Sequence, residues 1–153
     1  MSTGDNVSQL IKLHEDCGQS PWLDNITRGW ITSGEMRRWI DRGVRGITSN
    51  PTIFQKAMAS ADYDDELARL TRSGASVEEA YWQLVGSDIS AAADLLSGVH
   101  ESSGGVDGWV YVALSHALPH DTAGTIQAAR SLHRHHALDH LSHKSPATPE
   151  GNR

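Results

Sequence analysis

A strand, a helix and a second strand follow one another near the start of this chain, and this pattern constrains its fold more than any other feature. Trp22–Ile26 is strand-like, with its polar residues towards the carboxyl end. Thr32–Glu35 has the pattern of a helix-opening capping box, and apolar residues then repeat at helical spacing until Gly43. Val44–Ser49 is a second short strand. Such a unit predicts a parallel sheet with a right-handed crossover.

The rest of the chain continues the alternation of helices and strands. An opening helix is expected within residues 1–18, and Trp109–Leu114 is the segment with the strongest strand propensity. The other expected elements are helical segments at 62–72, 76–85, 88–99 and 121–137, and a fourth strand at Leu141–Ser145. Polar residues interrupt that fourth strand, although a buried parallel strand is normally a near-continuous apolar run. We expect four parallel strands, adjacent in chain order, with helices on the outer side and 146–153 as a loose tail.

Length and composition limit the class of protein. A complete (β/α)8 barrel needs about 250 residues and this chain has 153, so a single domain over 1–153 is expected. The formal net charge of −6 argues against a non-specific nucleic-acid partner. The sequence has no apolar run of membrane-spanning length, no signal-like start and one cysteine, Cys17. We therefore expect a cytoplasmic protein with no membrane partner.

Polar residues cluster where the predicted strands end. These are Asp24 and Asn25 after the first strand, Thr48 to Asn50 after the second, and Lys144 in the fourth. In α/β barrels the loops that follow the strands converge on one face and form the active site. Two simpler interpretations stay open at this point: Asp24 and Asn50 suit turns, and a single lysine is usually a solvated surface residue.

Three boxes of sequence resemble the amino-terminal half of the bacterial transaldolase family. They read WLDN at 22–25, GVRGITSNPTIF at 43–54 and KSPATPEG at 144–151. The intervening segments DDEL, DISAAADLL, DGWV and HDTAGTIQAA also fit, so the resemblance extends over nearly the whole chain from about Gln19 onward. It implies an α/β fold, namely a truncated (β/α)8 barrel of roughly the first four βα units behind a leading helix.

The resemblance also implies a reaction and a set of residues for it. A lysine at the end of the fourth strand, matched by Lys144, forms a Schiff base with a sugar-phosphate ketose, and a dihydroxyacetone unit passes to another aldose phosphate in the pentose phosphate pathway. Asp24 matches the acid/base that takes the C4-hydroxyl proton. Asn50 matches a residue that hydrogen-bonds the substrate or the imine, and Thr48 lies beside it. No metal or organic cofactor is implied, because the protonated imine is itself the electron sink.

Two departures from the family pattern weigh against turnover. The third strand of the family carries a glutamate that helps to handle the catalytic water, and the aligned residue here is Ala113. The chain also stops at Arg153, where the family continues with four more βα units that supply phosphate-binding residues. The alternative is therefore a catalytically inactive, truncated remnant, or a half-barrel that forms homo-oligomers or binds a full-length relative. We expect no measurable transfer from fructose 6-phosphate to erythrose 4-phosphate by this chain.

Histidines are concentrated near the end of the chain, with five of them between His133 and His143. His136 and His140 have the i, i+4 spacing that can hold zinc on a helix. A cysteine at motif spacing is missing, so we interpret these histidines as solvent-facing residues and predict no metal site.

Overall fold

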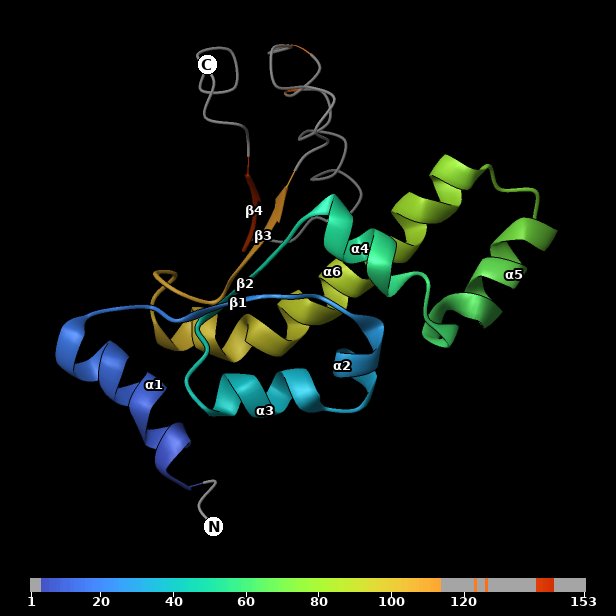
Figure 1. Cartoon of the computed structure of the whole chain (residues 1–153). Coiled ribbons are helices and arrows are strands. Elements are labelled where there is room, and N and C mark those ends of the chain that lie inside the picture. Colours follow the sequence, from blue (N-terminus) through green and yellow to red (C-terminus); the bar gives the residue numbers. More distant parts are fainter. Residues whose placement is uncertain (1–3, 114–122, 124–125, 127–139, 145–153) are drawn as a thin grey trace.

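The protein has a mixed α/β fold in which helices cover one face of a parallel sheet (Figure 1). The computed structural model describes residues 4–113, 123, 126 and 140–144, with the backbone alone at 4–8, 143 and 144. The helix predicted at 121–137 therefore lies outside the described residues, apart from helical backbone at 123 and 126. The predicted tail at 146–153 also lies outside them.

Four short strands form the sheet in chain order. They are β1 (Trp22–Asp24), β2 (Gly46–Ser49), β3 (Trp109–Ala113) and β4 (Leu141–Lys144), and each is parallel to its neighbour. This confirms the predicted topology. β1 is two residues shorter than predicted, because pairing with β2 ends at Asp24 and the chain then turns to bury Ile26. The polar β4 pairs in register with β3 over its whole length.

Seven helical elements accompany the sheet in the described residues. They are α1 (Gly4–Cys17), α2 (Arg28–Thr32), α3 (Glu35–Asp41), α4 (Pro51–Ala57), the 3-10 turn η1 (Ala61–Tyr63), α5 (Asp64–Arg72) and α6 (Val77–Ser102). The predicted capping box at Thr32 is wrong. Thr32 ends α2 instead, its hydroxyl donates to the Arg28 carbonyl at 3.0 Å, and α3 begins after Gly34.

Helix α6 is one continuous element of 26 residues where two helical segments were predicted. A capping box opens it, because Ser76 and Glu79 exchange side-chain and backbone hydrogen bonds. A glycine inside a helix costs about 1 kcal/mol relative to alanine. Gly86 nevertheless continues the helix, because Val85 and Ile89 on either side of it are fully packed in the core.

The core lies between the sheet and the helices. Ile47, Val110 and Leu141 occupy one register row of β2, β3 and β4, and their side chains are buried against α3 and α6. A smaller apolar cluster around Tyr63 packs α5 against the beginning of α6. No helix in the described part of the chain is long and apolar enough to cross a membrane.

Asp107 joins the amino ends of the sheet. Its carboxylate accepts from the Ser20 hydroxyl at 2.6 Å, ahead of β1, and from Arg45 Nε at 2.5 Å, ahead of β2. Its carbonyl lies 2.9 Å from His100 Nδ1 at the end of α6. The His100 ring stacks on that of His140, which precedes β4. We call Ser20, Arg45, His100 and Asp107 the amino-end clamp.

Candidate active site

The sheet register brings two of the predicted site residues together. Asp24 in β1 is the direct partner of Thr48 in β2, and Thr48 is the partner of Tyr111 in β3, which in turn pairs with Ser142 in β4. Neighbours in one register row point to the same face, here the face opposite the buried row of Ile47. Asp24 is exposed, and Thr48, Tyr111 and Ser142 are half-buried. Asp24 and Thr48 thus share one open face of the sheet.

Asn50 lies directly after β2 and begins helix α4. Its side-chain Oδ1 accepts a hydrogen bond from the Ile53 backbone N–H at 3.1 Å, which makes Asn50 the N-cap of the helix. Pro51 follows at the first helical position, where its missing N–H is not needed. The cap occupies the amide oxygen and leaves the side-chain NH2 group as the donor for a further partner. This short helix was not predicted, although Asn-Pro is a sequence signal for it.

Lys144 is the last residue of β4, and its backbone pairs with Ala113 at the end of β3. Both lie one row beyond the pairing of Ser49 with Val112, at the carboxyl end of the sheet. The Lys144 side chain lies outside the described residues. The predicted positions of Asp24, Asn50 and Lys144 at the carboxyl ends of three strands are therefore present in the backbone. Of the predicted histidine cluster, only the His140 side chain is described; its Nε2 lies 3.0 Å from the Ala93 carbonyl.

Aromatic residues lie on the same open face, Tyr111 in the row of Asp24 and Trp22 in the next occupied row towards the amino end. The rings of Trp22 and Tyr111 meet edge to face at 4.6 Å between centroids, and Trp22 is 36% exposed. Position 46 must be glycine for this arrangement, because a Cβ there would overlap the Trp22 indole. The sequence interpretation did not include Tyr111 among the site residues. Strand alternation was the signal for it, since Tyr111 is two residues before Ala113.

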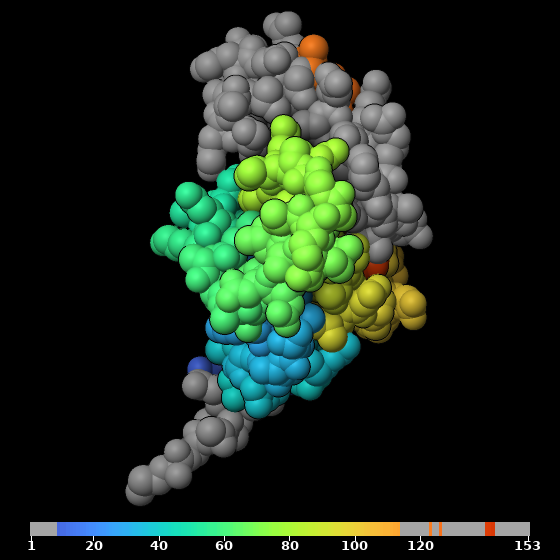
Figure 2. Space-filling view, turned by 90° about the vertical axis from the view of Figure 1, so that its right-hand side faces the viewer, coloured from blue at the N-terminus to red at the C-terminus, as the bar shows by residue number. Residues whose placement is uncertain are grey.

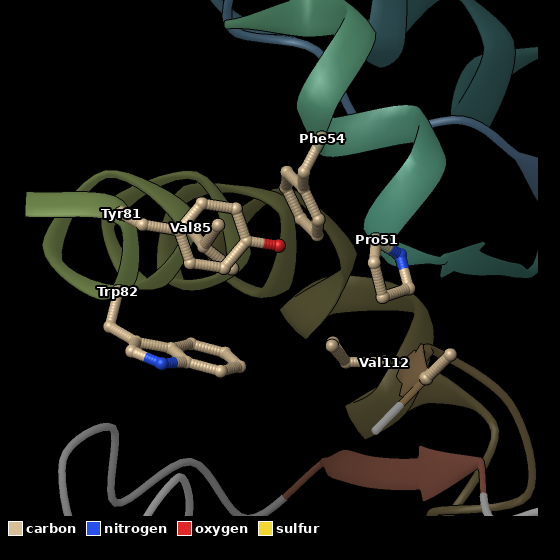
Figure 3. A pocket seen from close by; sticks show the side chains of 7 residues that line it. Pro51, Phe54, Tyr81, Trp82, Val85 and Val112 are labelled. Carbon is tan, nitrogen blue, oxygen red and sulfur yellow. The ribbon is translucent and has the colours of Figure 1, made fainter. Parts of the chain in front are cut away.

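An apolar pocket of about 290 Å³ lies at the ends of β2 and β3 (Figure 3). Figure 3 shows the rings of Phe54 and Tyr81 on one side of it and Trp82 at its border. The described residues that line it are Pro51, Phe54, Tyr81, Trp82, Val85, Val112 and Ala113. None of these seven is charged, so among the described residues the pocket offers no cation for a phosphate group.

An ion-pair network surrounds the segment that follows β1. Arg28 Nε donates to Asp88 Oδ1 at 2.9 Å and Arg28 Nη1 to Glu66 Oε2 at 2.5 Å, while the Tyr63 hydroxyl donates to Asp88 Oδ2 at 2.6 Å. Burial raises the pKa of Asp88, and the hydrogen bonds from Tyr63 and Arg28 offset only part of this effect. Burial, together with the bond to Asp88, also raises the pKa of Tyr63. We call Arg28, Tyr63, Glu66 and Asp88 the Arg28 network.

Comparison with known proteins decides the family. Residues 21–153 match the family described as Transaldolase/Fructose-6-phosphate aldolase. The chain belongs to this family. The match confirms the resemblance that the three sequence boxes carried, and it covers every strand of the sheet.

Several bacterial transaldolases are similar to this chain. The transaldolase of Thiobacillus denitrificans is 46% identical over 136 residues, and that of Neisseria gonorrhoeae is 43% identical over 135 residues. Transaldolase 2 of Nostoc punctiforme is 40% identical over 136 residues. Each comparison covers 88% of this chain but only 36–38% of the relative. The chain thus spans less than two fifths of the length of these transaldolases.

Proposed function

We propose that this chain supplies the Schiff-base lysine and the acid/base of a transaldolase site. The observation that carries the proposal is the register of the sheet. Asp24 and Thr48 are paired neighbours on its open face, and Lys144 ends β4 at the carboxyl edge of the same sheet. Barrel enzymes of this kind assemble their catalytic groups from the ends of several strands. Sugar phosphates are the proposed substrates, and the cytoplasm is the proposed compartment.

In the proposed reaction the neutral Lys144 amine attacks C2 of fructose 6-phosphate, and loss of water from the carbinolamine gives the imine. Asp24 accepts the C4-hydroxyl proton, the C3–C4 bond breaks, and its electron pair moves into the protonated imine. Glyceraldehyde 3-phosphate leaves, and a three-carbon enamine stays on Lys144 for transfer to an aldose phosphate. The NH2 group of Asn50 donates a hydrogen bond to the bound sugar.

We further propose that the sheet is the first half of a (β/α)8 barrel whose open face becomes the barrel interior. The face carries Trp22, Tyr111 and the half-exposed Trp109, which are large enough to fill interior layers. A second candidate function follows from the same face and from Ala113. In it, the chain is a non-catalytic half-barrel that associates with a copy of itself or with a longer relative through these aromatic residues.

Borohydride trapping separates the two functions. The 153-residue chain is incubated with fructose 6-phosphate and borohydride, and peptides are analysed by mass spectrometry. We expect a reduced adduct on Lys144 that Lys144→Ala abolishes and that Lys56→Ala, a change in the last turn of α4, leaves intact. Absence of an adduct, or its presence on another lysine, would overturn the enzymatic proposal. If no adduct forms and sedimentation velocity shows that the chain self-associates, the binding function is favoured.

A further inference from the structure

The placement of the Asp24 carboxylate depends on the backbone around it. Asp24 is exposed, and no hydrogen bond or ion pair reaches its side chain in the part of the chain that the structure describes. On its amino side, pairing with Thr48 in β2 fixes the residue. On its carboxyl side, three residues connect it to Arg28, the first residue of α2. The buried Ile26 side chain within this connection and the contacts of Arg28 at its end therefore both limit how far Asp24 can move.

Arg28 is held by side chains from three other elements. Its guanidinium binds Asp88 of α6 and Glu66 of α5, and its Cζ lies 4.5 Å from the centre of the Tyr63 ring in η1. The Tyr63 hydroxyl also accepts from the Arg28 backbone N–H at 3.2 Å. The side chains of Arg28 and Asp88 are only 15% and 3% exposed, so these bonds are shielded from water. The network therefore fixes both the side chain and the main chain at Arg28.

A close side-chain contact adds to this anchorage. A Cβ at Gly29 would lie 2.7 Å from Asp62 Oδ2, so the Asp62 side chain of η1 packs closely against the backbone of α2. Figure 2 shows the green α5 region directly against the blue α2–α3 region at the surface. The η1–α5 segment thus packs against the segment that follows β1, more than thirty positions earlier in the chain.

We propose that Tyr63, Asp88 and Arg28 are positioning residues for Asp24. They fix the end of the β1–α2 connection, and through it they keep the Asp24 carboxylate over the carboxyl edge of the sheet. This inference rests on the proposed function of Asp24 as the base for C3–C4 cleavage. A displacement of about 1 Å can cost a hundredfold in rate at a reacting group. A loosened connection therefore slows cleavage and leaves imine formation on Lys144 unaffected.

The mass of the trapped adduct separates these two steps. Reduction before cleavage leaves a six-carbon phosphorylated adduct on Lys144, and reduction after cleavage leaves a three-carbon adduct. Tyr63→Phe removes one hydroxyl from the network and keeps the ring beneath Arg28. We expect the ratio of six-carbon to three-carbon adduct to rise about tenfold in this variant, with the total adduct unchanged. Asp24→Asn sets the upper limit, with six-carbon adduct alone.

Backbone NMR relaxation tests the positioning independently of the chemistry. In Tyr63→Phe we expect order parameters at 25–27 to fall below the value of about 0.85 typical of rigid backbone, while those of β2 stay unchanged. Ser73→Ala is the matched control, because it removes another α5-region hydroxyl, which donates to the Leu70 carbonyl at 2.7 Å. Arg28→Lys, which keeps the charge and loses the forked geometry, should give an intermediate result.

Each outcome decides the inference. Unchanged order parameters at 25–27, an equal loosening of β2, or loosening without a change in the adduct ratio would overturn it. If the unmodified chain forms no adduct at all, the proposed function fails, and the relaxation data alone then decide whether the network positions Asp24. Local loosening at 25–27 would still support the positioning role in that case.

Discussion

The two ends of the sheet use polar residues in opposite ways. At the amino ends, the Asp107 carboxylate has bonds from both Ser20 and Arg45 and is almost fully buried. At the carboxyl ends, Asp24 is exposed without a partner among the described residues, and Asn50 uses only its amide oxygen. Partnered groups stabilise a fold, whereas groups with free bonding capacity remain available to a ligand. The comparison separates the part of the sheet that maintains the structure from the part that the proposed chemistry uses.

The largest expected effect is a loss of stability caused by a substitution at the amino end of the sheet. Arg45→Met leaves the buried Asp107 without its cation, and we expect the free energy of unfolding to fall by about 3 kcal/mol. Asp24→Asn should change it by less than about 0.5 kcal/mol, because the residue is exposed. Urea denaturation measures both. Arg38→Met, which removes an exposed i, i+3 pair with Glu35, is the control and should resemble Asp24→Asn. Equal losses in Arg45→Met and Asp24→Asn would contradict the comparison.

A smaller effect distinguishes the two buried Arg–Asp pairs by their response to pH. Burial opposes the ionisation of Asp107, but the bonds from Ser20 and Arg45 outweigh it and lower the pKa of that carboxyl. Burial raises the pKa of Asp88 and prevails over its partners. The charged form of Asp107 therefore adds stability that is lost as the pH falls through its lowered pKa. Asp88 has the opposite sign, because the folded state takes up its proton first and gains stability as the pH falls.

We therefore expect opposite slopes for two isosteric variants. The stability difference between the unmodified chain and Asp107→Asn should shrink between pH 7 and pH 3, and the difference for Asp88→Asn should grow. Urea denaturation at a series of pH values gives both slopes. Parallel slopes would mean that the two pairs do not differ in this way.

How much of this could be predicted from the sequence differs between elements. The parallel order of the strands followed from the strand–helix–strand pattern, because crossover handedness leaves few topologies. The start of a helix at Ser76 was predicted correctly, whereas the capping box predicted at Thr32 was wrong, because helix α2, which was not predicted, already ends at Thr32. The capping pattern is a local signal, and neighbouring elements decide whether the chain uses it.

Long-range polar pairs could not be predicted. Arg28 and Asp88 are 60 positions apart, and Arg45 and Asp107 are 62 apart, so no local spacing marks either pair. The positions of Asp24, Thr48 and Asn50 at strand ends could be predicted, because parallel strands end at one edge. The cap formed by Asn50 and the contact of Tyr111 with Trp22 required the folded arrangement.

The smallest expected effect concerns Ser49, the last residue of β2. Its side chain is fully buried, and its hydroxyl has no hydrogen-bond partner among the residues that the structure describes. Ser49→Ala removes this unsatisfied group, so we expect the free energy of unfolding to rise by up to about 1 kcal/mol. Ser97→Ala, on the exposed surface of α6, should leave it unchanged. A loss of stability in Ser49→Ala would show that the hydroxyl has a partner in solution.

Helix α6 connects the Arg28 network to the amino-end clamp, because it carries a residue of each. At about 1.5 Å per residue, the twelve positions from Asp88 in the Arg28 network to His100 in the amino-end clamp span about 18 Å. A tilt of about 3° with its pivot at His100 would carry Asp88 sideways by about 1 Å, because the two residues lie on one continuous helix. A substitution in the amino-end clamp could thus leave the protein folded and still misalign Asp24, by leverage alone.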